Sequence, residues 1–248
     1  MRYLRVFVFV ISVLYSFQSF AQPWSANKIG LDSSVPLPWT PLKVVKNDQG
    51  IIVKCWGRSY YFDGRGLLTQ IVAQDQKILS QPLSFVVDNY KQNTSSFKIV
   101  KISEAEVVLQ NTINYRDKGL LTLNISISYD GLVYYKLKYQ SNQLSRQTLK
   151  ISIPIANNIA KYIHRPADPS LNKTGSWKTG LLSEVMGVVD YSAYMSYFWI
   201  GDQNSGLTWF MESPINWPNY KAQDAVEITR TKYGTKAILN LGNKNQYK

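Results

Sequence analysis

Alternating apolar and polar positions run along the chain from Leu42 onward. The alternation is nearly complete over residues 121–129, where Leu, Leu, Ile, Ile and Tyr are separated by Thr, Asn and Ser. Successive side chains of a β-strand point to opposite faces, so this pattern predicts a strand with one buried and one solvated face. Further runs of β-branched and aromatic residues, each closed by Gly, Asp or Asn, predict strands at 51–56, 59–62, 67–72, 96–102, 107–115, 149–154, 197–200, 207–210, 225–229 and 237–239.

One tight turn can be placed from the sequence. Asp130 and Gly131 separate the run 121–129 from the run 132–139. Both turn residues tolerate a positive φ, which the two-residue turns of hairpins require. We therefore expect a long antiparallel hairpin centred on this pair.

The spacing of the strands predicts the fold class. Short strands follow each other about every 8 to 12 residues, and no helix longer than two turns is indicated, which is typical of an all-β antiparallel sandwich. One long irregular stretch, from His164 to Ala193, is interrupted by two prolines and three glycines. Loops of this length in compact domains are usually functional or partly disordered, so we expect this stretch to be one long irregular loop of either kind.

The first 21 residues have the pattern of a secretory signal peptide. Arg2 and Arg5 precede an apolar run over 6–14, and Ser19 and Ala21 provide a small-x-small cleavage site. The apolar run is too short to span a bilayer. We expect residues 1–21 to be removed, residues 22–248 to form the β-sandwich domain, and the product to be secreted or periplasmic, with no membrane association after cleavage.

Composition and charge exclude several classes of protein. The chain is 45% hydrophobic and 18% charged, a globular balance, and its one cysteine, Cys55, excludes an intramolecular disulfide framework. Cys55 is expected to be a small buried residue in a strand. The net charge is +12, but the lysines are scattered singly, with no basic run or basic helix. We therefore expect no nucleic-acid partner.

Catalytic chemistry has few candidate residues. With one histidine, His164, and one cysteine, the sequence has no metal-binding spacing, so we expect no metal and no cofactor. There is no Gly-x-Ser-x-Gly elbow to present a nucleophile. Glycosidic cleavage normally needs two carboxylates, and Glu212 alone follows an aromatic run. Its alternative interpretation is a strand-end charge paired with a nearby lysine.

Late aromatic residues indicate carbohydrate contact instead. Flat indole faces framed by a few polar groups suit the apolar side of a sugar ring. The candidates lie in or beside loops, with polar side chains nearby: Trp177, Trp209, Glu212, Asn216 and Trp217. The alternative is that these tryptophans pack in the core, as most do.

Three blocks of the sequence resemble a known family. They are PWTPL (38–42), VKCWGRSYYF (53–62) with the runs 67–71 and 78–83, and YFWIGDQNSGLTWFMES (197–213) with 216–217 and 225–230. Together they resemble the N-terminal domain of proteins similar to glycoside hydrolase family 123. The resemblance spans most of the chain after residue 21, and its motifs are strand and turn signatures rather than catalytic ones.

The resemblance implies a secreted protein in which a β-sandwich precedes a separate (β/α)₈ barrel. In that family an adjacent Asp-Glu pair in the barrel assists attack by the substrate's own N-acetyl group on N-acetylgalactosaminides. This chain has no adjacent Asp-Glu pair, so we expect no catalytic residues in it. The family pattern would continue beyond residues 237–241, so the domain is expected to be truncated at its C-terminus, without the barrel.

Three hypotheses about function follow. The first is a non-catalytic β-sandwich domain of a secreted glycoside hydrolase 123-like protein that supports degradation of N-acetylgalactosaminide-type glycans. The second is a free-standing carbohydrate-binding module, and the third is an inactive truncated remnant. The partners expected are a glycan or a separate glycoside hydrolase catalytic domain.

Overall fold

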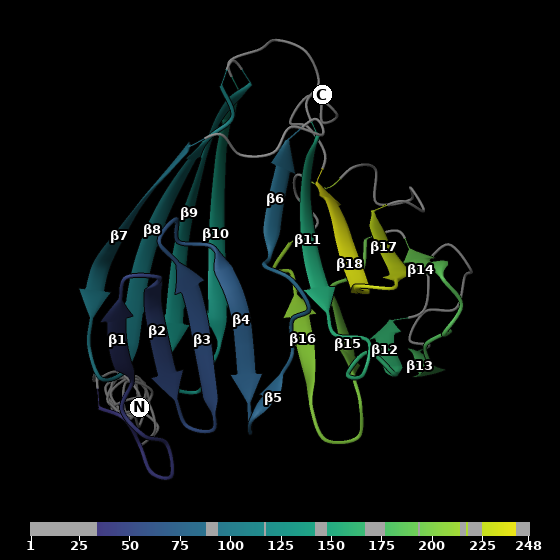
Figure 1. The fold of residues 1–248 in the computed structure, drawn as a ribbon, viewed down its shortest axis with the longest axis horizontal. Helices are drawn as coiled ribbons and strands as arrows, with labels where there is room; N and C mark the ends of the chain where they lie inside the picture. Colours follow the sequence, from purple (N-terminus) through teal and green to yellow (C-terminus); the bar gives the residue numbers. More distant parts are fainter. Residues whose placement is uncertain are drawn as a thin grey trace, which may run out of the picture. The chain divides into compact units, whose positions relative to one another are not determined.

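A computed structural model describes residues 34–87, 94–116, 118–141, 148–166, 177–192, 194–213, 217 and 225–241. Within these ranges the regular structure is eighteen strands in four antiparallel sheets (Figure 1). The same residues contain no helix long and apolar enough to cross a membrane. The predicted all-β antiparallel sandwich is therefore confirmed. The expected signal peptide, residues 1–21, lies outside the described residues.

Two sheets come from the first part of the described chain. The first has the order β1-β2-β3-β4-β5, with bounds Lys43–Asn47, Gly50–Cys55, Arg58–Asp63, Leu68–Ala73 and Gln76–Lys77. The second has the order β10-β9-β8-β7, with bounds Val133–Ser141, Gly119–Ser128, Glu106–Asn114 and Thr94–Ile102. Each is a meander of consecutive strands, which short turns can connect.

The other two sheets need longer connections. The third has the order β14-β17-β18-β11-β6, with bounds Gly187–Ser192, Val226–Thr231, Gly234–Leu241, Leu149–Ile155 and Ser84–Val87. The fourth has the order β13-β12-β15-β16, with bounds Trp177–Leu181, Tyr162–Pro166, Tyr197–Gly201 and Gly206–Phe210. The chain therefore alternates between these two sheets, and β13 and β14, neighbours in sequence, become edge strands of different sheets.

The predicted hairpin forms where the sequence places it. β9 and β10 pair antiparallel, with Ile127 opposite Val133. Gly131 has φ 84°, and the amide of Leu132 donates to Oδ1 of Asp130 at 3.0 Å. The turn also meets the first sheet, because the hydroxyl of Tyr60 donates to the carbonyl of Gly131 at 2.5 Å.

The core is formed by side chains that alternate between buried and partly buried positions along the strands. β9 alternates strictly between buried and partly buried positions, and β8 does so up to its last residue. The fully buried side chains come from all four sheets, so one apolar core connects them; examples are Val53, Leu123, Ile153 and Phe198. Cys55 is buried at the end of β2, as expected, and burial raises the pKa of its thiol.

Contacts of β10 join the second and fourth sheets. The inward ring of Tyr135 stacks on Trp209 of β16, with centroids 6.1 Å apart and planes 26° from parallel. The outward hydroxyl of Tyr134 donates to Oε2 of Glu212, just beyond β16, at 3.0 Å. Side chains from both faces of β10 thus contact residues at the end of β16, so the second and fourth sheets adjoin at these strands.

The stretch from His164 to Ala193 differs from the expected loop. Its described parts include the end of β12, all of β13 and all of β14, while residues 167–176 and 193 are outside the described residues. Glycines and a register shift between Val188 and Asp190 conceal these strands in the sequence. Strands β13 and β14 are short and lie at sheet edges, where irregular backbone is tolerated.

Candidate functional site

An aromatic cluster lies on the solvent face of the fourth sheet. The indole of Trp177 stacks on the imidazole of His164, with centroids 5.2 Å apart and planes 14° from parallel. Tyr197 completes the cluster, with its ring centroid 5.6 Å from Trp177 and 6.0 Å from His164. Trp177 is 53% exposed, so one face of the cluster is open to solvent. We call His164, Trp177 and Tyr197 the aromatic platform.

Strand register brings the three rings together. His164 is directly opposite Thr179 on β13 and opposite Trp199 on β15. Cross-strand partners share a face, and so do residues two apart on one strand. Trp177 and Tyr197 therefore project from the same face as His164, although the three residues span 33 positions of the sequence.

Hydrogen bonds fix the orientation of the imidazole. Its Nδ1 lies 2.6 Å from Oγ1 of Thr179, and its Nε2 lies 3.1 Å from the hydroxyl of Tyr197. A hydroxyl can both donate and accept, so either tautomer of His164 finds partners. Both ring nitrogens are therefore engaged, which holds the imidazole in its position against Trp177.

Trp199 continues the flat surface toward β16. A Cβ atom placed on Gly201 would lie 2.3 Å from the indole carbon Cζ2 of Trp199, and one on Gly206 would lie 2.6 Å from its Nε1. The indole therefore lies across the backbone of these two glycines. The exposed ring of Phe210 and the hydroxyl of Thr208 follow on β16.

The inner face of the same strands carries a buried charge cluster. Nε and Nη2 of Arg165 donate to the two carboxylate oxygens of Asp190 at 2.8 and 2.9 Å, and Nζ of Lys178 donates to Oδ1 at 2.8 Å. Burial raises the pKa of Asp190, but the hydrogen bonds from Arg165 and Lys178 outweigh it and hold that pKa below its usual value. The cluster ties β12, β13 and β14 together beneath the platform.

The structure separates the five carbohydrate-binding candidates. Trp177 belongs to the platform. Trp209 points inward from β16, opposite the buried Phe198, and its Nε1 has no hydrogen-bond partner among the described residues. Trp217 is only 5% exposed and packs edge-on against Tyr194, with centroids 5.3 Å apart. Asn216 lies outside the described residues.

Glu212 is exposed but already engaged. It accepts the hydroxyl of Tyr134 at 3.0 Å, and this hydrogen bond raises the pKa of Tyr134. No ion pair joins Glu212 to a lysine within the described ranges. The carboxylate therefore links β10 to the end of β16, two residues beyond Phe210.

Two residues of the platform, His164 and Tyr197, are not predicted as site residues from the sequence. His164 precedes Arg-Pro and suggests a loop, yet it lies on β12; Tyr197 begins a run that suggests a buried strand. The signal available was the alternation of Tyr162, His164 and Pro166 with the buried Ile163 and Arg165. Five residues are too few for that pattern to stand out.

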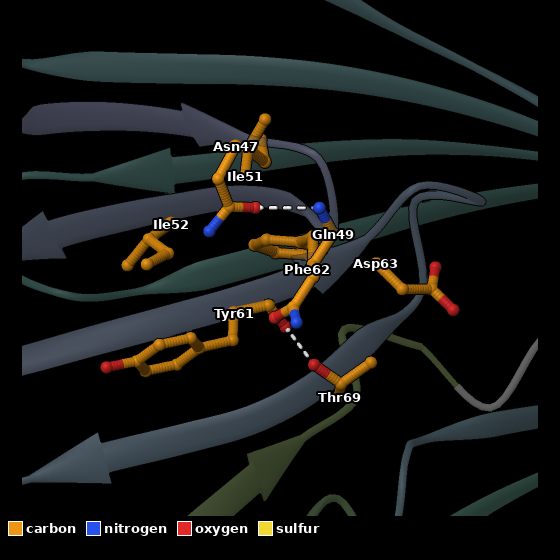
Figure 2. Close-up of a pocket in the computed structure, with 8 residues that line it drawn as sticks. All are labelled: Asn47, Gln49, Ile51, Ile52, Tyr61, Phe62, Asp63 and Thr69. Carbon is orange, nitrogen blue, oxygen red and sulfur yellow. Dashed lines mark hydrogen bonds between the residues drawn. The ribbon is translucent and has the colours of Figure 1, made fainter.

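A hollow lies on the first sheet, apart from the aromatic platform (Figure 2). Its volume is ≈ 240 Å³, and it is lined by Asn47, Gln49, Ile51, Ile52, Tyr61, Phe62, Asp63 and Thr69. Its only carboxylate belongs to Asp63 and accepts from Nε and Nη2 of Arg65 at 2.9 and 2.7 Å. The hollow thus offers no pair of free carboxylates for glycosidic cleavage.

The described part of the chain also lacks a cluster of three or more His, Cys, Asp or Glu side chains that could hold a metal ion. The arrangement on the fourth sheet can present flat aromatic faces to a ligand. It holds its charged groups on the opposite face of the sheet.

These features define an antiparallel β-sandwich domain with an exposed aromatic surface. Comparison with protein-family models gives a match described as glycoside hydrolase 123, third domain, over residues 44–246. The match covers most of the 248 residues, and the chain belongs to this family. The family resemblance is confirmed; the matching description names the third domain, whereas the sequence blocks resemble the N-terminal one. A search of curated proteins finds no match.

Proposed function

We propose that this chain is a non-catalytic, exported glycan-binding domain of a glycoside hydrolase 123-like system, and that the aromatic platform is its binding site. Membership of the family supports a role in glycan degradation. N-acetylgalactosaminide-type glycans are the ligands proposed, on the resemblance described above. The glycan and a glycoside hydrolase catalytic domain are the proposed partners.

The exposure and stacking of Trp177 carry this proposal. Its indole is 53% exposed and is held parallel to His164, so its orientation is largely fixed before a ligand binds. A preorganised side chain loses less conformational freedom on binding. The aliphatic C–H groups of a sugar ring can lie on the open face, while the hydroxyls of Thr179 and Thr208 lie on the same face of the sheet.

The charges around the platform support a binding role rather than a catalytic one. Within the described residues of the fourth sheet, the solvent face carries no carboxylate. The nearest buried carboxylate, Asp190, is neutralised by Arg165 and Lys178 on the inner face. Cleavage of a glycosidic bond without two suitably placed acidic groups would need a different mechanism.

The binding test compares two tryptophans of similar exposure. Trp177 is 53% exposed and stacks on His164; Trp56, in the turn between β2 and β3, is 51% exposed and packs edge-on against Trp39 at 5.3 Å. On an array of N-acetylgalactosamine-terminated glycans, Trp177→Ala should lower affinity about tenfold or more, as expected for an anchor residue, whereas Trp56→Ala should leave it unchanged. Equal affinities of the two variants would exclude the platform as the site.

A second measurement tests the absence of catalysis. The protein should release no aryl group from aryl N-acetylgalactosaminides above the rate of the blank. Turnover that remains after repeated purification, and that co-elutes with the protein, would contradict the non-catalytic assignment.

A further inference from the structure

The solvent face of the second sheet carries lysines in register with amides and hydroxyls. One cross-strand row runs Lys98, Gln110, Asn124, Lys136 from β7 to β10. The adjacent row runs Ser96, Thr112, Thr122, Lys138. We call these two rows the lysine face.

No ion pair among the described residues involves the lysines of the lysine face, and the one carboxylate seen to contact the outward side of β10 is that of Glu212, which accepts the hydroxyl of Tyr134. Lys98, Lys136 and Lys138 are all exposed. Within β7 to β10 the one carboxylate belongs to Glu106, which is paired with Lys101 at 2.8 Å. Opposite charges across strands would stabilise a solvated sheet face, yet neither row has any. Lysines on the edge strands β7 and β10 would also discourage pairing with the strands of another chain. That role explains the lysines but not the amide side chains of Gln110 and Asn124 that lie between them.

The centre of the face can hydrogen-bond a polar ligand. Nε2 of Gln110 donates to Oδ1 of Asn124 at 2.8 Å, which leaves the Nδ2 hydrogens of Asn124 and Oε1 of Gln110 without a partner among the described residues. The hydroxyls of Thr112 and Thr122 lie in the next row. The lysine face thus has cations on its edge strands and, between them, hydrogen-bond donors and acceptors that can bind hydroxyl groups.

The dimensions suit an extended ligand. Strands in a sheet are about 4.8 Å apart, so Lys98 and Lys136 are separated by about 14 Å across the sheet. Lys136 and Lys138 are about 7 Å apart along β10, since each residue of a strand rises about 3.4 Å. Three cations spread over such an area match a chain with repeated negative charges better than a single small anion.

We propose that the lysine face binds an acidic polysaccharide, a glycan chain that carries sulfate or carboxylate groups. This goes beyond the proposed function because the surface, the sheet and the charge of the ligand are different. A glycan is favoured over nucleic acid for two reasons. The face has no arginine, the side chain best suited to bidentate phosphate contacts, and its one exposed aromatic residue is Tyr134, too few for base stacking.

The test measures binding of the full chain to immobilised chondroitin sulfate, with neutral dextran and single-stranded DNA as comparison probes. The triple variant Lys98→Gln, Lys136→Gln, Lys138→Gln removes the cations of the face. The control triple Lys43→Gln, Lys46→Gln, Lys54→Gln removes the same charge from exposed positions of the first sheet. Circular dichroism checks that both variants retain their strands.

We expect wild type to bind chondroitin sulfate but not dextran, with affinity that falls as salt rises. The first triple should weaken binding at least about tenfold, and the control triple by less than about twofold. Equal losses in both triples, no binding by wild type, or tighter binding to DNA would overturn the proposal. Trp177→Ala should retain binding to chondroitin sulfate. The proposal for the lysine face and the proposal for the aromatic platform can therefore fail independently of each other.

Discussion

Arg165 and Asp190 form an ion pair that is almost completely removed from solvent, directly beneath the aromatic platform. Their closest N–O distance is 2.8 Å, and each side chain is 5% exposed. Arg165 lies between His164 and Pro166 on β12, so the strand that presents the imidazole outward is anchored inward to β14. This ion pair therefore joins the platform strand to β14, in addition to the contact of Lys178 with Asp190.

Loss of the arginine should destabilise the fold strongly. Arg165→Met leaves Asp190 buried with Lys178 as its one cationic partner, which should lower the free energy of unfolding by about 3–5 kcal/mol in urea titrations. The matched change Lys178→Met removes a side chain that is 49% exposed, so its cost should be below about 1 kcal/mol. Similar costs for the two variants would show that Arg165 and Asp190 are not a buried pair in solution.

Acid should remove the contribution of Asp190. Because the pKa of this carboxyl is lower in the folded protein than in the unfolded chain, its stabilisation is present above the unfolded pKa of about 3.9 and is lost as pH falls through the folded pKa. Wild type should therefore lose stability below about pH 4. The double variant Arg165→Met, Asp190→Leu should lose less over the same range, and an identical pH profile would contradict the assignment.

The sequence predicts strands well where alternation is long and less well where strands are short. β9 and its hairpin with β10 are predicted because the nine alternating residues 121–129 and an Asp-Gly turn agree. β13 and β14 are missed because all five residues of β13 are exposed and a bulge interrupts β14, so neither shows an apolar face. Their pairing with different sheets is a tertiary preference that no local pattern encodes.

The candidate site is predictable only in part for a related reason. Trp209 and Phe210 are adjacent aromatic residues, and the sequence does not reveal which of them faces the core. Register decides: Trp209 is opposite the buried Phe198, whereas Phe210 is opposite Tyr197 and is 59% exposed. The platform itself requires three strands to align, which is a property of the sheet rather than of any segment.

Trp209 should matter for stability rather than for direct ligand contact. Trp209→Ala removes the ring that stacks on Tyr135 between the second and fourth sheets, at a cost of about 3 kcal/mol in the free energy of unfolding. Trp209→Phe keeps an aromatic ring there and should cost less. In the temperature range where each variant is folded, glycan affinity should match wild type; a variant that is fully folded but has lost binding would contradict the inward placement.

The most direct test of the central claim observes the indole groups themselves. The chain has seven tryptophans, so an ¹⁵N-labelled sample gives indole N–H resonances that single Trp→Phe variants can assign. During titration with an N-acetylgalactosamine-terminated oligosaccharide, the resonance of Trp177 should shift in a saturable way, and those of Trp56 and Trp217 should not. Saturable shifts at Trp56 or Trp217 with none at Trp177 would contradict the assignment of the platform as the glycan-binding site.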